Sequence, residues 1–560
     1  MVLLLAACAD PAPVDASCRY GLDEDGDGVC DGDTVDWSAD ATIEPGTERS
    51  NIYGLAPDDL AAVRERGMQH AFVWPVDVTG LLIPYRPFED YMQDPANAGA
   101  VALLRDQLGF GTFEEFYSWL GLARYPEPGG FDELPIPEGM APGDAVGAAV
   151  IDTEWGEGLT FSCAACHAST LFGHTVFGMS NRRARANAVF LLAGDLTQTL
   201  TADAFQSLTD ATAEERALYE RTLDNYGAVG AKEPEVLGLD TAVAQIGLSL
   251  GRRADDPWAT FSEAAEREPA FTDLETFVAD SKPAVWWTLR YKTRWLSDGA
   301  LISGNPMVYN VLANELGRGT DLHALSDWLE QDRKALDELT VAVFATEAPR
   351  WTDFFPGTLD EAQAREGQVL YEEHCASCHG TYEKGWDSGA EDPFATTRVT
   401  YHAQTPVVDV GTDGQRTEGD FGYTGRLNQL QILLDSGSEF VTEDGYVPPP
   451  LDGIWARYPY LHNNSVPTLC ELLSPAEERT TVFYQGPADD PVTDFDAACV
   501  GYPVGDAIPE SWLGDTDARF DAAIPGLRNI GHEEMLRDET GAWVLDPEER
   551  ARLVMYLKTL

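Results

Sequence analysis

Residues 163–167 read Cys-Ala-Ala-Cys-His, and residues 375–379 read Cys-Ala-Ser-Cys-His. In this pattern two thiols at a fixed spacing join the vinyl groups of one haem, and the adjacent imidazole reaches the iron. A lone Cys-x-x-Cys pair also suits a redox dithiol or half of a zinc site, but two complete motifs argue strongly for haem. The predicted attachment and proximal residues are Cys163, Cys166, His167, Cys375, Cys378 and His379. The sequence therefore predicts two covalently bound haem c groups.

The length and charge of the chain limit the remaining classes of function. A chain of 560 residues exceeds one ordinary core, so two domains with additional segments are expected. The formal net charge of −58 argues against nucleic-acid binding, which relies on Lys and Arg. No apolar run approaches the roughly 18 residues of a membrane-spanning helix. A small redox protein or cytochrome that donates electrons to this chain is expected to present a basic patch.

The other five cysteines indicate an oxidising compartment. Cys8 ends the sequence Leu-Ala-Ala-Cys after a short apolar stretch, which resembles the lipobox of bacterial lipoproteins, although a basic region before it is missing. The alternative is that Cys8 is an unprocessed residue of a short tail. Cys18 with Cys30, and Cys470 with Cys499, can form disulfides. The count predicts an exported bacterial lipoprotein, in the periplasm or on the cell surface, that meets the membrane only through a lipid on Cys8.

The predicted fold class is mainly α, with two cytochrome c-type haem domains, long loops and a disordered acidic tether before them. Pro349, Pro356 and Gly357 interrupt the helical pattern, so we expect a domain boundary near residues 345–357. The predicted segments are a lipoprotein leader over 1–8, an Asp/Gly-rich tether over 9–50, an N-terminal haem domain over 51–350 and a C-terminal cytochrome c domain over 357–560.

The tether contains a candidate calcium loop. Carboxylates at alternate positions, with a glycine for the sharp turn, can converge on one hard cation. The residues concerned are Asp23, Asp25, Asp27 and Asp31, which lie between Cys18 and Cys30 or directly after them. The closing acid of an EF-hand is absent, and the alternative of a solvated acidic linker stays open.

Local signals place several helix starts. Thr212-Ala-Glu-Glu215 and Thr358-Leu-Asp-Glu361 each have the capping pattern that opens a helix, and the second helix runs into the second haem motif. Asp546 can cap a C-terminal helix with Pro547 in its first turn. The apolar face of that helix is predicted to contain Leu553, Leu557 and Leu560.

Residues 451–469, Leu-Asp-Gly-Ile-Trp-Ala-Arg-Tyr-Pro-Tyr-Leu-His-Asn-Asn-Ser-Val-Pro-Thr-Leu, resemble the signature block of the bacterial di-haem cytochrome c peroxidase superfamily. The ending, with Gly531-His532-Glu533 and a final helix, is similar to the long branch that includes the haem-containing rubber oxygenases. The resemblance is dense from about residue 360 and thinner before it, where it rests on the haem order and on Lys282-Pro-Ala-Val-Trp286-Trp287. Tyr458 and Asn464 replace the small residues usual in the block.

The resemblance implies that His532 is the distal ligand of the C-terminal haem, which would make that haem an electron relay. Met535 is the second choice for this ligand. Trp455 and His462, both within the signature block, are assigned to cofactor binding, with His462 against the haem edge or a propionate.

The resemblance also implies that chemistry occurs at the N-terminal haem. His174 and Met179 are each either a labile distal ligand or an ordinary loop residue, and the loop is favoured for His174. Trp286 and Trp287 either line the distal pocket or are core residues. A basic cluster in this acidic chain is expected to pair with haem propionates, or else to form a solvated face. It consists of Arg182, Arg183 and Arg185.

Three functions follow as hypotheses. The leading one is reduction of hydrogen peroxide to water at the N-terminal haem, with electrons relayed by the C-terminal haem. The second is a dioxygenase that binds O2 at the N-terminal haem and cleaves an apolar substrate such as a polyisoprene. The third is a pure electron-transfer cytochrome in which both irons carry two protein ligands.

Overall fold

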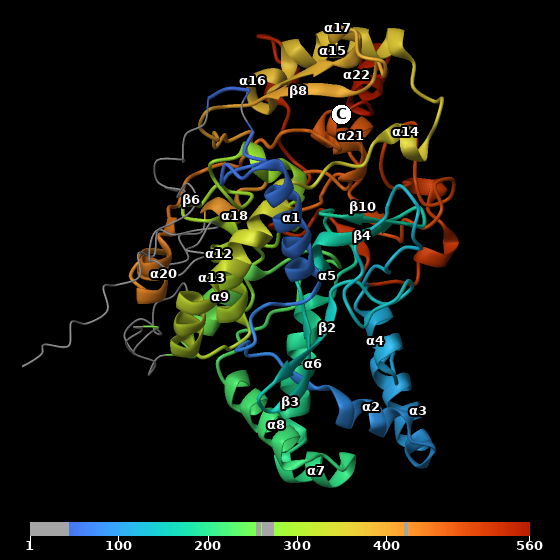
Figure 1. Cartoon of the computed structure of the whole chain (residues 1–560). Helices are drawn as coiled ribbons and strands as arrows, with labels where there is room; N and C mark the ends of the chain where they lie inside the picture. Colours follow the sequence, from blue (N-terminus) through green and yellow to red (C-terminus); the bar gives the residue numbers. More distant parts are fainter. Residues whose placement is uncertain (1–43, 47, 254–258, 260–273, 419–423) are drawn as a thin grey trace, which may run out of the picture.

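The computed structural model describes residues 44–46, 48–253, 259, 274–418 and 424–560 (Figure 1). Helices hold 42% of the residues and strands 11%, which confirms the predicted mainly α class. The helices before residue 355 are α1 (Pro57–Phe72), α2 (Tyr85–Gln93), α3 (Ala98–Leu108), α4 (Phe113–Trp119), α5 (Ala164–His167), α6 (Ala186–Thr199), α7 (Ala202–Thr209), α8 (Ala213–Tyr226), α9 (Ala242–Gly251), α12 (Pro306–Gly317), α13 (Leu322–Phe344) and α14 (Trp351–Phe354).

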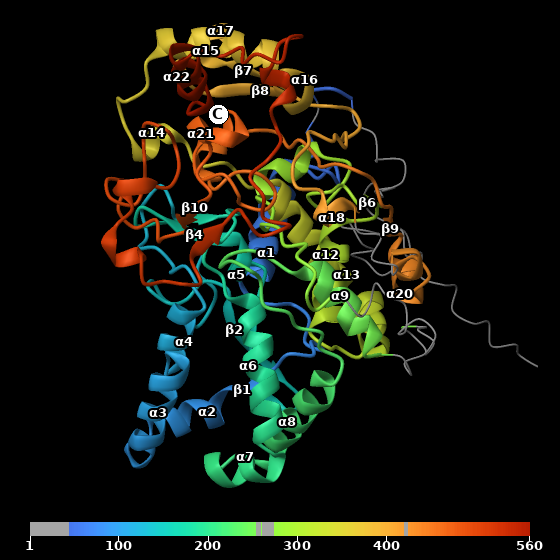
Figure 2. The same ribbon diagram turned by 180° about the vertical axis from the view of Figure 1, so that it is seen from behind.

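The helices after residue 355 are α15 (Glu361–His374), α16 (Ala376–His379), α17 (Gly385–Ser388), α18 (Gln415–Glu418), α19 (Thr424–Leu427), α20 (Gln431–Ser436), α21 (Leu469–Leu472) and α22 (Pro547–Leu557). Of these, α15, α16, α17 and α22 lie in the upper part of the molecule in Figures 1 and 2. The strands after residue 355 are β7 (Thr381–Lys384), β8 (Thr396–Thr400), β9 (Glu439–Phe440), β10 (Val482–Tyr484) and β11 (Arg519–Asp521), of which β7 pairs with β8 and β10 with β11.

The close crossing of α15 and α22 builds the C-terminal cytochrome-like core. Asp546 caps α22 in a complete capping box with Pro547 at its start, as the sequence predicts. The first turn of α15 is capped by Asp360, whose carboxylate accepts from the Gln363 N–H, and not by Thr358 as predicted. Gly367 lies so close to α22 that a Cβ there would be 2.0 Å from the Arg552 carbonyl oxygen.

Each haem motif is a single helical turn, α5 or α16, followed by a short antiparallel pair of strands. After α5 come β4 (Ala168–Leu171) and β5 (His174–Phe177), and after α16 come β7 and β8. In both places the turn begins at the first cysteine, because the His N–H donates to that carbonyl: His167 to Cys163 and His379 to Cys375. The first cysteine and the histidine are thereby fixed within one turn.

A bundle of α1, α9, α12 and α13 forms the middle of the molecule (Figures 1 and 2). Strands β6 (Leu301–Ser303) and β9 pair, so the segment around residues 424–440 packs with this bundle although it follows the second haem motif in sequence. Helices α2, α3, α7 and α8 lie at the lower end of the molecule in Figure 1. The same part of the chain contains a three-stranded antiparallel sheet in the order β1-β3-β2. Its strands are β1 (Ile83–Pro84), β2 (Ala148–Thr153) and β3 (Gly156–Phe161). Thr212 caps α8 with Glu215 in the predicted capping box.

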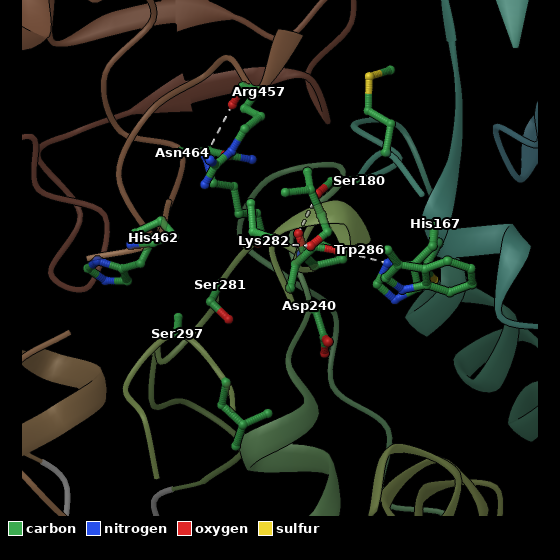
Figure 3. A pocket seen from close by; sticks show the side chains of 18 of the residues that line it. His167, Ser180, Asp240, Ser281, Lys282, Trp286, Ser297, Arg457, His462 and Asn464 are labelled. Atoms are coloured by element: carbon green, nitrogen blue, oxygen red, sulfur yellow. Dashed lines mark hydrogen bonds between the residues drawn. The ribbon is translucent and has the colours of Figure 1, made fainter. Parts of the chain in front are cut away.

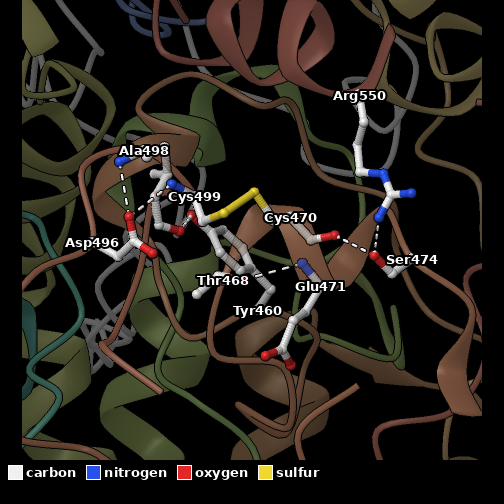
Figure 4. Close-up of a disulfide and its surroundings, with 10 residues drawn as sticks. Tyr460, Thr468, Cys470, Glu471, Ser474, Asp496, Ala498, Cys499 and Arg550 are labelled. Carbon is white, nitrogen blue, oxygen red and sulfur yellow. Dashed lines mark hydrogen bonds between the residues drawn. A yellow bond between two sulfur atoms is a disulfide. The ribbon is translucent and has the colours of Figure 1, made fainter. Parts of the chain in front are cut away.

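The predicted disulfide between Cys470 and Cys499 is present, with a Cα–Cα distance of 5.0 Å (Figure 4). It joins α21 to the segment that follows β10. The predicted lipid-bearing Cys8, the Cys18–Cys30 disulfide and the calcium loop of Asp23, Asp25, Asp27 and Asp31 all lie outside the described residues. Within the described ranges, no cluster of three or more His, Cys, Asp or Glu side chains is arranged for a metal ion, and no helix is long and apolar enough to span a membrane.

The packing at Gly367 gives a first prediction. Helix propensity alone favours Gly367→Ala by about 1 kcal/mol. The added Cβ would meet the Arg552 carbonyl at 2.0 Å, so we expect a net loss of about 1–3 kcal/mol in the free energy of unfolding. Denaturant titration of the intact protein, followed by circular dichroism, measures this change.

The matched control is Gly99→Ala in α3, where a Cβ meets no atom within 4 Å. Because no steric contact opposes the higher helix propensity of Ala there, this variant should be at least as stable as the parent. Equal stabilisation by both substitutions would contradict the packing described for α15 and α22.

Candidate haem-binding site

One cavity of about 460 Å³ is lined by both haem motifs. The side chains that meet there include Cys163, Cys166, His167, Cys375, Cys378, His379 and His532. The four cysteines of the motifs form no disulfide. Figure 3 shows His167 and Trp286 on one side of this cavity and His462 on the opposite side, with Lys282 and Asp240 between them. The structure therefore brings together two motifs that are about 200 residues apart in sequence.

Both motif histidines have the hydrogen bonds and the protonation state that a metal-binding imidazole needs. His167 Nδ1 lies 3.0 Å from the Ala284 carbonyl oxygen, and His379 Nδ1 lies 2.8 Å from that of Pro449. Because a carbonyl only accepts, each Nδ1 carries the proton and each Nε2 keeps its lone pair for a metal. Burial lowers the pKa of both His167 and His379 to about 4, so both rings are neutral at pH 7, as ligation requires.

His532 faces His379 across the cavity, with 6.2 Å between the ring centroids. An iron bound by both Nε2 atoms at ordinary metal–imidazole lengths of about 2 Å needs centroids roughly 6–6.5 Å apart. Burial lowers the pKa of His532 to about 3, which keeps this imidazole neutral as well. The spacing fits the prediction that His532 is the second ligand of the C-terminal haem. Met535 also lines the cavity.

The surroundings of His167 are different. Its ring stacks on Trp286, with centroids 4.9 Å apart and an interplanar angle of 29°. Trp286 lines the cavity beside this predicted proximal ligand, and its part in a distal pocket stays a prediction. Trp287 is fully buried outside the cavity and donates to the Asp452 carbonyl, which contradicts its predicted place in the lining of a distal pocket.

Other predicted residues divide between the cavity and its surroundings. His174 opens β5, with Nδ1 3.1 Å from an Asp132 carboxylate oxygen, and lies outside the cavity, which contradicts a role as distal ligand. Trp455 is also outside, because its indole donates to the Pro349 carbonyl and packs against Trp351, so its assignment to cofactor binding is contradicted. Met179 and His462 do line the cavity, and His462 stacks on Tyr446 with 3.8 Å between centroids.

The predicted arginine cluster is split by the structure. Arg182 is buried in the cavity wall over the Tyr458 ring, and its Nη2 atom is buried without a hydrogen-bond partner. Arg183 and Arg185 point to the other side and pair with Asp515 and Asp517. Arg182 and Arg183 lie in a turn, which sends their side chains in different directions, and the acids that neutralise Arg183 and Arg185 follow more than 300 residues later. The propionate prediction is therefore contradicted for Arg183 and Arg185.

Six Lys or Arg side chains line the cavity wall: Arg182, Lys282, Lys292, Arg318, Arg416 and Arg457. Of these, only Arg182 was predicted from the sequence to bind a haem propionate. Burial lowers the pKa of Lys292 to about 7 and that of Arg457 to about 10, because few anions compensate them within the protein. A buried charge needs an opposite charge, and haem propionates are carboxylates that these cations can bind. No local sequence signal distinguishes Lys292 or Arg457 from surface cations.

In the described part of the chain, Asp240 is the one carboxylate residue that lines the cavity. One of its oxygens accepts from the Ala242 N–H, and its main chain pairs with Ser281 in both directions. Burial raises the pKa of Asp240, and the nearby Arg416 partly opposes this. Asp240 was not identified from the sequence, because an isolated Asp after a short loop has no distinguishing pattern.

These features fit haem c. The two motif imidazoles are neutral with Nε2 free, and three other histidines also line the cavity: His374, His462 and His532. The motif thiols form no disulfide and stand at the required spacing, and buried cations in the wall can bind carboxylates. His167 and His379 would hold the irons as proximal ligands, and the four motif cysteines would hold the porphyrin edges.

Comparisons with known proteins agree with this geometry. Residues 445–484 match the family described as RoxA-like, cytochrome c-like, and residues 362–429 match that of cytochrome C oxidase, cbb3-type, subunit III. The uncharacterized protein y4iJ of Sinorhizobium fredii is 31% identical over 261 residues, which are 38% of this chain and 41% of that protein. The uncharacterized protein y4iM of the same organism is 31% identical over 196 residues, or 32% of this chain and 43% of that protein.

The aligned region thus spans about two fifths of the length of these curated relatives. The two family matches cover the second haem motif and the whole signature block, and they leave the N-terminal half unmatched. The C-terminal part of the chain contains cytochrome c-type sequence with a RoxA-like region, and the protein is a haem c redox protein.

Proposed function

We propose that this protein is a di-haem c oxidoreductase that reduces hydrogen peroxide to water beside His167, with electrons that enter beside His379 and His532. The asymmetry of the two sites supports the proposal most directly. His379 faces a second imidazole at 6.2 Å, whereas the ring next to His167 is Trp286, and no described imidazole faces His167 at a comparable distance.

When bound, haem c supplies one-electron redox chemistry and, where an axial position is open, a place for a small oxygen ligand. His379 and His532 would together hold one haem as its two protein ligands, which would restrict that haem to electron transfer. His167 is held by the Ala284 carbonyl, and the side opposite it is left to the cavity. The proposed roles, electron transfer beside His379 and peroxide binding beside His167, therefore follow from the presence of a second imidazole at only one of the two sites.

Asp240 is the proposed proton-transfer group. Reduction of one peroxide molecule to two water molecules consumes two electrons and two protons, so protons must reach the cavity. Asp240 is a cavity carboxylate with a raised pKa, which lets it hold a proton closer to neutral pH than an exposed Asp does. One carboxylate oxygen is engaged by the Ala242 N–H, and proton transfer is assigned to the other.

A second candidate is a dioxygenase that cleaves an apolar substrate such as a polyisoprene. The wall of the cavity toward α4 and α6 is apolar, with Leu81, Leu120, Leu122, Phe161, Val189 and Phe190, and the family match is RoxA-like. Incubation with polyisoprene under ¹⁸O2 tests it: isotope-labelled carbonyl products favour this candidate. We also propose that a small redox protein with a basic face donates the electrons. A lipid on Cys8 is the proposed attachment of the protein to a membrane.

The first functional prediction concerns turnover. The purified protein, half-reduced so that one haem holds an electron, should consume hydrogen peroxide rapidly with a small cytochrome as donor. An exposed-histidine variant, His323→Ala in α13, should match the parent. Absence of turnover in a protein that still binds carbon monoxide or O2 would contradict the peroxidase and favour the dioxygenase.

The second functional prediction concerns Asp240→Asn, which keeps the acceptor for the Ala242 N–H but removes the titrating proton. Peroxide turnover should fall by about 10²–10⁴-fold, the usual effect of losing a general acid–base group. Cyanide affinity and the absorption spectrum of the resting protein should not change. Ser281→Ala, at a neighbouring position in the cavity wall, is the control and should keep full turnover. Unchanged turnover in Asp240→Asn would remove this residue from the scheme.

A further inference from the structure

His532 is held in a backbone conformation that residues with a Cβ seldom adopt. Its φ is +61°, and that of Gly531 is +76°. This left-handed region is disfavoured by a Cβ close to the following carbonyl, so the surrounding structure must hold the residue there. Gly531 is itself confined, because a Cβ at this position would lie 2.2 Å from the main chain of Gly411.

The imidazole of His532 lacks the anchor that the two motif histidines have. His167 and His379 each hold a backbone carbonyl with Nδ1, but His532 Nδ1 is buried without a hydrogen-bond partner in the described structure. The orientation of this ring must therefore be set through the main chain that presents it. One main-chain contact is direct: the His532 N–H donates to the Val410 carbonyl at 2.7 Å.

Arg479 binds the loop immediately before His532. This side chain is 4% exposed, and its Nη1 donates to the carbonyls of Asn529 at 2.6 Å and Gly531 at 3.0 Å. The other guanidinium nitrogens also donate to main-chain carbonyls. Nε donates to the carbonyls of Glu471 and Ser474, and Nη2 donates to the Leu472 carbonyl at 3.4 Å. One planar group thus joins the loop of His532 to the segment around α21.

The segment that Arg479 binds is fixed independently. Cys470, within α21, is disulfide-bonded to Cys499, and the Ser474 hydroxyl accepts from Arg550 of α22 (Figure 4). Glu533, next to His532, accepts from the Ala476 N–H at 3.0 Å on the same segment. The support therefore passes from the disulfide through α21 to Arg479, and from Arg479 to the carbonyl directly before His532.

We propose that Arg479 is the positioning residue that keeps His532 facing His379. The inference rests on the proposed ligation of the C-terminal haem by His532. When the guanidinium is lost, the carbonyls of Asn529 and Gly531 lose their donors and the strained loop relaxes. The imidazole then leaves the 6.2 Å arrangement, and the position opposite His379 opens to external ligands.

The test uses the full-length protein with its haems attached and compares Arg479→Met with His532→Ala. Absorption and electron paramagnetic resonance spectra report the low-spin signal of the C-terminal haem, and a cyanide titration reports how firmly the internal ligand is held. We expect Arg479→Met to bind cyanide at this haem about 10–100-fold more tightly than the parent, the usual effect of removing a group that orients a metal ligand. Added imidazole should restore the low-spin signal in both variants.

Arg528→Met is the matched control, because Arg528 lies in the same loop but is half-exposed and donates to neither carbonyl. It should behave as the parent. An unchanged spectrum in His532→Ala would refute the ligation itself. A changed spectrum in His532→Ala, together with parental cyanide affinity in Arg479→Met, would refute only the positioning role.

A conservative variant keeps the test decisive if Arg479→Met does not fold. Arg479→Lys keeps the charge but cannot donate to five carbonyls from one planar group. We expect cyanide affinity at the C-terminal haem between those of the parent and His532→Ala, with an unchanged signal from the N-terminal haem. Full parental behaviour of Arg479→Lys would overturn the proposal.

Discussion

The facing imidazoles of His379 and His532 are the constraint on which the rest of the C-terminal half depends. One is fixed within a single helical turn next to α15, and the other lies on an irregular loop more than 150 residues later. To bring them 6.2 Å apart, α15 and α22 cross at Gly367, α21 is held by a disulfide, and Arg479 fastens the loop. Each of these contacts joins segments that are distant in sequence, so the geometry of the pair is a property of the assembled fold.

The chain is strongly acidic as a whole, but the wall of its cavity is basic. The chain has a formal net charge of −58, yet the cavity wall contains six Lys or Arg residues and, among the described residues, one carboxylate. Buried cations are costly unless opposite charges compensate them. Arg318 and Arg416 pair with Glu315 and Asp298, and haem propionates would supply carboxylates to other cations of the wall. The same cations would stabilise the reduced, less positive state of a nearby iron.

The sequence predicted those features that short segments determine. The two motifs, the caps at Thr212 and Asp546 and the Cys470–Cys499 pair need only local spacing or simple counting, and the structure contains the caps and the disulfide as predicted. Prediction from the sequence failed where the direction of a side chain depends on a partner that is distant in the sequence. Arg183 and Arg185 point toward Asp515 and Asp517, and His174 toward Asp132. Lys292, Asp240 and Arg479 had no local signal, because their surroundings come from other parts of the chain. His532 was placed by resemblance and not by pattern.

In the proposed protein one iron has two protein ligands and the other has an open position. Carbon monoxide binding to the fully reduced protein distinguishes the two irons, because the gas binds a ferrous haem only where an axial position is open or easily vacated. We expect one carbon monoxide bound per chain, with the spectrum of a low-spin haem remaining beside it. Binding of two molecules would show that His532 does not hold its iron, and binding of none would leave the protein as an electron-transfer cytochrome.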